Sequence, residues 1–200
     1  TLTWNHENEL ASPNVVPGGG GDIWPCKPNT ETGLKERGFE FLAEMERLHM
    51  IVDVSHLSDR GFWDIAEHST RPFAASHSNC RALAPHCRNL TDEMIRVMAE
   101  KGGLVGLNYC SGFLDDQPRP ELCRSTTALM ARHAAHFKQV GGIEIIGLGS
   151  DFDGIGGKLE MGDCSKLPLL ADALRKEGFT EDEVEQIFFR NARRFFEENL

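Results

Sequence analysis

The sequence lacks the features that mark membrane proteins and proteins with an amino-terminal secretion signal. None of its apolar stretches approaches the roughly 18 consecutive apolar residues that a membrane-spanning helix needs. The first residues, TLTWNHENEL, do not form a basic segment followed by an apolar one, so they do not resemble a signal peptide. We therefore expect a protein without a membrane segment that is located in the cytoplasm.

Basic residues are also scarce. The 200 residues contain 21 Lys and Arg against 31 Asp and Glu, which gives a net charge of −10 at pH 7. Proteins that bind nucleic acid need a basic face to meet the phosphates. The charge balance therefore argues against a nucleic-acid partner, and by itself it identifies no other partner.

The cysteines form no CxxC pair, which excludes a zinc-ribbon site. Six cysteines in 200 residues are also too few for a fold built on disulfides. We expect reduced, mostly buried thiols, in keeping with a cytoplasmic protein.

Apolar, β-branched segments alternate with helical patterns along the chain. The segments that predict strands are 1–4, 50–55, 71–76, 104–110 and 143–150. The segments that predict helices are 31–49, 58–68, 89–103, 125–142, 166–177 and 181–198. This order is typical of a parallel sheet covered by helices, and we expect a single domain over residues 1–200.

Threonines at three predicted helix starts supply local signals for where the helices begin. Thr30 can cap the first helix and Thr91 the third, because a threonine hydroxyl accepts from the backbone N–H groups of the first turn. Thr180 and Glu183 form the capping-box pattern before the last helix.

Polar side chains follow the predicted strands at the points where the strands end. His56 follows the second strand, His77 the third and Asp151 the last. Because the carboxyl ends of parallel strands meet at one edge, these side chains are expected to lie together, where such folds carry their chemistry. The full set at strand ends is Trp4, Asn5, His6, His56, His77, Asn108, Tyr109 and Asp151.

Two imidazoles from neighbouring strands suit a zinc ion, and Asp151 could supply a carboxylate at the same edge. Arg88 could bind a substrate carboxylate through two parallel hydrogen bonds. A single histidine at a strand end is more often a hydrogen-bonded loop residue than a metal ligand. For two histidines and an aspartate at one edge, the pattern favours neither interpretation over the other. His133 and His136 lie on a predicted helix, where we expect a solvent-exposed face.

These segments resemble the membrane dipeptidase (renal dipeptidase) family of zinc peptidases. The segments that carry the resemblance are VDVSHLS, ASHSNCRAL, RNLTDE, GLNY and GLGSDFDG, in the order and spacing of that family and over the whole chain. The resemblance implies a TIM-like (β/α) barrel. This chain would form about its last five βα units, with an extra C-terminal helix.

The resemblance also implies the hydrolysis of dipeptides by a hydroxide that bridges two zinc ions. His56 and His77 would be ligands of the second zinc. Arg88 would hold the substrate's carboxylate, and Asp151 would contact its amino group or assist proton transfer. The other residues that we place in the substrate-binding set are Asn108, Tyr109 and His6.

The sequence departs from the family's pattern in two places. It contains no His-x-Asp motif, with which the family binds its first zinc, and no counterpart of the family's bridging glutamate is found. Where the family has a histidine near the first strand, this chain has Trp4, with His6 as the alternative. We therefore expect a C-terminal portion that is inactive alone, holds one zinc or none, and associates with itself or with the missing half.

Three other functions stay open at this point. They are a related amidohydrolase that acts on another small amide, a non-catalytic remnant that binds metal or peptide, and a purely structural α/β domain. Metal content would separate an enzyme with about two zinc ions from a remnant with one or none. The segments 11–30 and 111–124 are predicted loops that would set specificity, and their composition does not reveal which dipeptides are cleaved.

Overall fold

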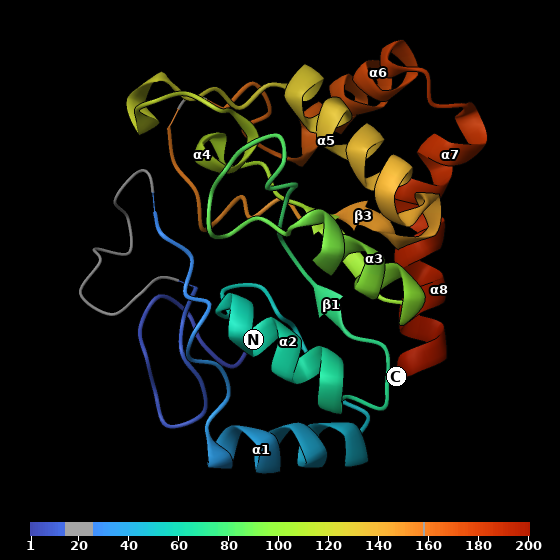
Figure 1. Ribbon diagram of the computed structural model, residues 1–200. Coiled ribbons are helices and arrows are strands. Elements are labelled where there is room, and N and C mark those ends of the chain that lie inside the picture. Colours follow the sequence, from blue (N-terminus) through green and yellow to red (C-terminus); the bar gives the residue numbers. More distant parts are fainter. Residues whose placement is uncertain (15–25, 158) are drawn as a thin grey trace.

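The computed structural model describes residues 1–14, 26–157 and 159–200, which form an α/β fold around a small parallel sheet (Figure 1). In these ranges the sheet has three strands in the order β1-β2-β3. They are β1 Ala74–Ala75, β2 Leu104–Leu107 and β3 Ile146–Leu148. The register places Val105 between Ala75 and Ile146, and both strand pairs are parallel. The parallel sheet is confirmed.

The prediction of five strands is wrong for the described residues. The second predicted strand makes one parallel bridge, from Asp53 to Ala74, and the backbone then leaves the extended region at His56, whose φ is 71°. Residues 1–4 form no strand. The Thr3 hydroxyl donates to the carbonyl oxygen of His56 at 3.1 Å, so side-chain hydrogen bonds hold this segment in place of a strand ladder.

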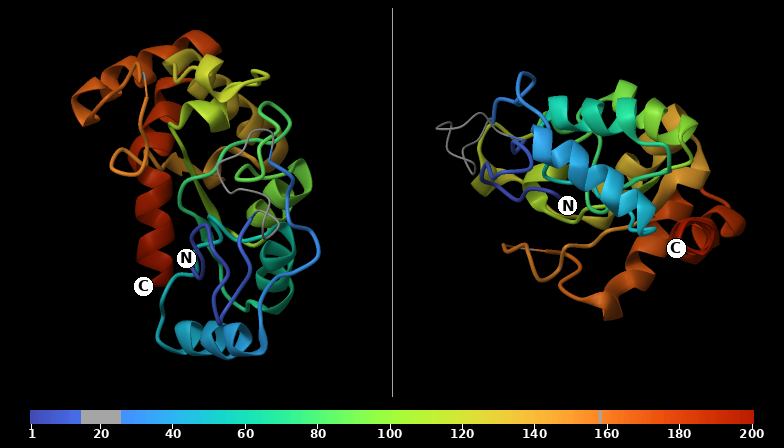
Figure 2. Two further views of the ribbon diagram at one scale, coloured as in Figure 1. Left: turned by 90° about the vertical axis from the view of Figure 1, so that its left-hand side faces the viewer. Right: turned by 90° about the horizontal axis from the view of Figure 1, so that it is seen from below.

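Helices cover both sides of the sheet, and Figure 2 shows α8 on the side opposite α2 and α3. The α-helices are α1 Glu36–Arg47, α2 Asp59–His68, α3 Asp92–Glu100, α4 Ser111–Leu114, α5 Thr127–Gly141, α6 Leu167–Glu177, α7 Glu181–Glu185 and α8 Asn191–Asn199. Shorter 3-10 segments are η1 Pro120–Leu122, η2 Ile143–Ile145 and η3 Cys164–Lys166, and the π-helical segment η4 Gln186–Arg190 joins α7 to α8. No helix within the described ranges is both long and apolar enough to cross a lipid bilayer.

The helix caps follow the sequence in most places. Thr91 caps α3, and Thr180 and Glu183 form the capping box of α7, as predicted. The first helix starts later than expected, and its N-cap is Lys35. Tertiary hydrogen bonds hold the preceding residues out of the helix, because the Leu34 N–H donates to a carboxylate oxygen of α2 at 2.8 Å.

The core between the sheet and the helices also contains His133, which is 1% exposed. Its Nδ1 accepts from the Cys80 N–H at 3.1 Å, and its Nε2 donates to the Leu114 carbonyl oxygen at 3.0 Å. The prediction of a solvent-exposed face is wrong for His133, because helical spacing alone does not reveal which face packs inward. His136 bonds Asp92 at 2.7 Å. Burial lowers the pKa of His133 to about 4, so its ring is neutral at pH 7.

Candidate active site

Two histidine rings meet where the second predicted strand and β1 end. The Nε2 atoms of His56 and His77 lie 2.9 Å apart. His56 and Asp151 both have a positive φ, of 71° and 61°, which is uncommon for residues other than glycine. Such backbone conformations concentrate at functional sites.

The outer nitrogens of both rings have oxygen partners. His56 Nδ1 donates to the Asn5 side-chain oxygen at 3.2 Å, and His77 Nδ1 donates to Ser76 Oγ at 2.7 Å. The Ser76 hydroxyl in turn donates to Asp53 at 2.6 Å, which leaves its oxygen free to accept. Both outer nitrogens therefore carry hydrogen, and both inner nitrogens direct lone pairs at the same point.

This donor set fits a zinc ion. Two nitrogen atoms that lie 2.9 Å apart with their lone pairs directed at each other repel unless a proton or a cation lies between them. Burial and the nearby Arg88 charge lower the pKa of both rings, that of His56 to about 2, so a proton is disfavoured there at pH 7. Two nitrogens that bind one tetrahedral zinc are roughly 3.3 Å apart, close to the separation seen here.

Asp53 stabilises the loop that carries His77. One of its carboxylate oxygens accepts from the backbone N–H groups of Ser55 and Ser76, both at 2.9 Å. The other accepts from the Ser76 hydroxyl. Asp53 thereby fixes the serine that orients the His77 ring.

A cavity of about 400 Å³ opens beside the histidines, a size that accommodates a small molecule. Its lining includes His56, Arg88 and Asp151, so the structure brings together these residues from three separate loops. His77 lies at its edge through its contact with His56.

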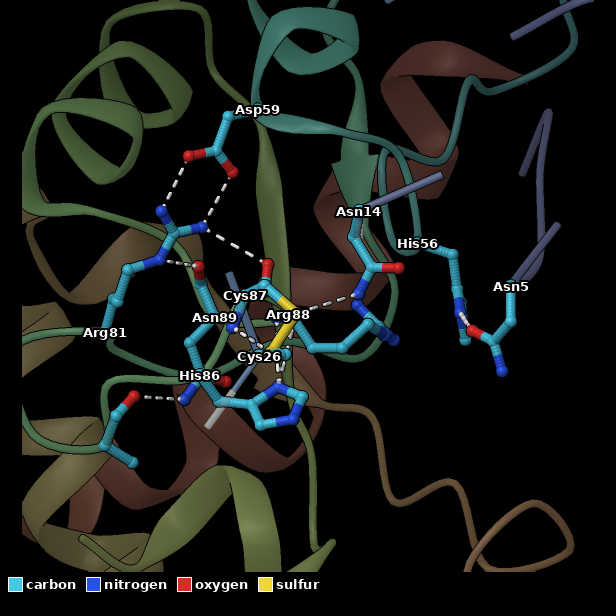
Figure 3. Close-up of a disulfide and its surroundings, with 11 residues drawn as sticks. Asn5, Asn14, Cys26, His56, Asp59, Arg81, His86, Cys87, Arg88 and Asn89 are labelled. Carbon is cyan, nitrogen blue, oxygen red and sulfur yellow. Dashed lines mark hydrogen bonds and ion pairs between the residues drawn. A yellow bond between two sulfur atoms is a disulfide. The ribbon is translucent and has the colours of Figure 1, made fainter. Parts of the chain in front are cut away.

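Arg88 is a buried cation in the cavity wall, 5% exposed (Figure 3). One terminal nitrogen donates to the His77 carbonyl oxygen at 3.3 Å, and Nε has no hydrogen-bond partner among the residues that the structure describes. Burial lowers the pKa of Arg88 to about 10, which leaves it charged at pH 7. A buried guanidinium with unused donors is suited to bind an anion.

Asp151 receives a hydrogen bond from a residue that was predicted to bind substrate. Asn108 Nδ2 donates to an Asp151 carboxylate oxygen at 3.2 Å, while the Asn108 side-chain oxygen accepts from the Cys110 N–H at 2.6 Å. Asn108 and Tyr109 are fully buried, and His6 is exposed. None of these three is among the described residues that line the cavity, so their role as substrate contacts stays a prediction.

Several lining residues were not singled out in the sequence. They are Asn14 from the predicted loop 11–30 and Phe113 and Pro120 from the predicted loop 111–124. That loop is partly helical, because it contains α4 and η1. In the other predicted loop, 11–30, residues 15–25 lie outside the described residues. Trp4 and Asn5, which were placed at the end of the first predicted strand, also line the cavity.

A disulfide joins Cys26 to Cys87, with their Cα atoms 5.9 Å apart. The expectation of six reduced thiols is therefore wrong for this pair. The free cysteines in the described ranges are Cys80, Cys110, Cys123 and Cys164. The donor atoms of Cys26, His86 and Cys87 lie within 4.8 Å of one another, but the two sulfurs are bonded to each other and are not free to bind a metal.

Comparison with known proteins points to one family. The sequence model of membrane dipeptidase, peptidase family M19, matches residues 1–199. A protein of Klebsiella pneumoniae, described as an uncharacterized protein in the pqqA 5' region, is 36% identical over 188 residues, which cover 94% of this chain and 67% of that protein. The uncharacterized dipeptidase C965.12 of Schizosaccharomyces pombe is 34% identical over 197 residues, which cover 97% of this chain and 44% of that protein.

The fold is also similar to that of a solved metallopeptidase. The structure of a metallopeptidase from Rhodobacter sphaeroides, liganded with a phosphinate mimic of the dipeptide L-Ala-D-Ala, superposes with a TM-score of 0.89 at 33% identity. The match covers 99% of this chain and 54% of that chain. This chain thus spans between 44% and 67% of the length of these three proteins.

Proposed function

The chain belongs to the membrane dipeptidase family, peptidase family M19, and on that premise we propose that it is part of a zinc-dependent dipeptidase. The observation that carries the proposal is the pair of His56 and His77 nitrogens, whose lone pairs face each other beside the cavity that Arg88 lines. For the whole protein we propose a TIM-like barrel. This chain would supply a C-terminal part of it as one domain over residues 1–200.

In this proposal His56 and His77 hold zinc, and the hydrogen bonds from their outer nitrogens to Asn5 and Ser76 keep both rings in the binding orientation. A bound zinc ion would polarise the peptide carbonyl and activate a water molecule.

Arg88 and Asp151 give the cavity one positive and one negative group. A dipeptide is zwitterionic, so its two ends match these charges. Arg88 binds the terminal carboxylate through its unused N–H groups, and Asp151 contacts the amino group or carries a proton. Asn108 holds the Asp151 carboxylate through the 3.2 Å hydrogen bond.

The proposed zinc count and the proposed association follow from the sequence. Without a His-x-Asp motif we propose one zinc in this chain and two in a complete active site, reached by association with a second copy or with the half of the barrel that the chain lacks. A cytoplasmic location stays a prediction. The Cys26–Cys87 disulfide weighs against it, because disulfides persist mainly in oxidising compartments.

A second candidate function is the binding of metal and peptide without hydrolysis, which the missing His-x-Asp motif favours. Zinc titration and dipeptide binding test what the two candidates share, and dipeptide hydrolysis by this chain separates them. We expect about one zinc per chain, dipeptide binding that needs both zinc and Arg88, and little turnover. A chain that binds neither zinc nor dipeptide would contradict both candidates, and rapid hydrolysis would exclude the second.

A further inference from the structure

The Cys26–Cys87 disulfide ends one residue before Arg88 (Figure 3). It ties a distant segment to the Arg88 loop across a sequence separation of 61. Both cysteines are buried, at 8% and 4% exposure, and the Cys87 N–H donates to the Cys26 sulfur at 3.1 Å. Neither cysteine is among the described residues that line the cavity, so the bond acts on the site only through its neighbours.

The backbone around Cys87 is held from a second direction by Arg81. One Arg81 nitrogen donates to the Cys87 carbonyl oxygen at 3.2 Å, and its Nε donates to the Asn89 carbonyl oxygen at 2.9 Å. Two parallel hydrogen bonds of 2.8 Å and 2.6 Å fix Arg81 to Asp59 at the start of α2. The loop is therefore anchored by the disulfide on one side and by this ion pair on the other.

The Arg88 side chain, in contrast, has few anchors of its own. It makes one 3.3 Å hydrogen bond to His77, its Nε is unpaired among the described residues, and its guanidinium carbon lies 5.5 Å from the centre of the Phe113 ring. The hydrogen bond of 3.1 Å to His86 Nδ1 comes from the backbone N–H of Arg88 and does not hold the side chain. The place of the guanidinium thus depends on how firmly the loop backbone is held.

We propose that the Cys26–Cys87 disulfide is a positioning element for Arg88, which keeps the guanidinium where it binds the substrate carboxylate. The identity of that ligand rests on the proposed function. A dithiol would undo the effect by exchange: the bond between the two protein sulfurs breaks, two thiols form with two protons, and the dithiol is oxidised to its own disulfide. Residue 87 then keeps its hydrogen bonds from Arg81 and from the Asn14 side chain but loses its covalent tie to residue 26, and carboxylate binding weakens.

A binding preference tests the proposal. The dissociation constants of a dipeptide and of its C-terminal amide are measured by calorimetry on the zinc-loaded chain and on Cys26→Ala/Cys87→Ala. The wild-type chain should prefer the free carboxylate by about tenfold or more, because hydrogen bonds to charged groups are strong. The variant should lose most of this preference while its affinity for the amide changes little. General destabilisation would weaken both ligands equally.

Two controls define the disulfide effect. Cys164→Ala removes an exposed free cysteine and should keep the preference. In an Arg88→Lys background, loss of the disulfide should cause no further change in the preference. If the double alanine variant does not fold, the wild-type chain treated with a dithiol and then reoxidised gives the same comparison.

A measurement without substrate separates this proposal from the proposed function. The Arg88 Nε–H is buried and should give a slowly exchanging signal in NMR of the chain labelled with ¹⁵N-arginine, assigned by its absence in Arg88→Lys. Loss of the disulfide should speed its exchange by about tenfold or more. Unchanged exchange and an unchanged preference would overturn the proposal. A wild-type chain that binds no dipeptide would refute the proposed function, while the exchange rate still decides the positioning.

Discussion

At the scale of single residues, the chemistry of the site depends on which ring nitrogens carry hydrogen. The Ser76 hydroxyl and the Asn5 amide oxygen accept hydrogen bonds from the Nδ1–H groups of His77 and His56. The Nε2 atoms of both rings are therefore unprotonated. Because the Ser76 hydroxyl is held by Asp53, metal affinity should depend on residues that do not touch the metal.

Ser76→Ala tests this dependence. The substitution removes the partner of His77 Nδ1, so the ring can adopt the wrong tautomer, and zinc affinity should fall by roughly 10–100-fold. A competition titration against a chromophoric chelator measures the change. Ser165→Ala, at an exposed position, is the matched control and should bind zinc like the wild type. Equal affinities in both variants would disprove the role of Ser76.

A second residue-scale prediction concerns His133. Its folded pKa of about 4 lies below the value of 6.5 for an exposed ring, so the unfolded chain binds more protons at intermediate pH. The stabilising effect is complete above about pH 6.5 and is lost as the pH falls towards 4. The stability difference between the wild type and His133→Gln should shrink by about 2 kcal/mol from pH 7.5 to pH 5. Urea unfolding at both values measures it, and a constant difference would refute the prediction.

At the scale of secondary-structure elements, local signals predicted two of the three expected threonine caps, whereas the extent of strand pairing was not predicted. The caps Thr91 and Thr180 were predicted because a threonine hydroxyl and the next turn of helix decide the matter locally. The late start of α1 was not, because the hydrogen bond from Leu34 to α2 spans 30 residues. Strand pairing is equally non-local, and apolar residues 50–55 could not reveal that only Asp53 forms a bridge.

Gly106 in β2 lies where the sheet supports the site. A Cβ atom there would be 2.0 Å from the Ser76 carbonyl oxygen, so Gly106→Ala must displace the loop that carries His77. We expect a destabilisation of about 2–4 kcal/mol and weaker zinc binding. Gly147→Ala in β3 is the control, because its Cβ would meet a Leu104 methyl at 3.4 Å, an ordinary contact. Thermal unfolding and zinc titration that rank the two variants equally would contradict this account.

At the scale of the whole molecule, the order of parallel elements made the main site predictable. His56, His77 and Asp151 each follow a strand or bridge segment, and their convergence follows from the common direction of those segments. The burial of Asn108 and Tyr109 was not predictable, because a strand end does not reveal which of its side chains face the cavity. The Cys26–Cys87 pair had no sequence signal, since spacing alone does not pair distant cysteines.

Zinc should also stabilise the folded chain as a whole. A ligand that binds only the folded state at 100 times its dissociation constant adds about 2.7 kcal/mol to the free energy of unfolding. We expect this gain for the wild type and its loss on removal of zinc with a chelator. His56→Ala/His77→Ala should show no gain. Urea unfolding with and without zinc provides the measurement, and an equal gain in the double variant would place the zinc elsewhere.

The central claim is that His56 and His77 together hold one zinc ion, and calorimetric zinc titration of the two single alanine variants tests it most directly. His6→Ala serves as the control, because His6 is exposed and outside the cavity lining. The account predicts that the wild type and His6→Ala bind zinc with the same affinity, while His56→Ala and His77→Ala each lose at least about tenfold. Zinc affinity that survives unchanged in either of the latter variants would contradict it.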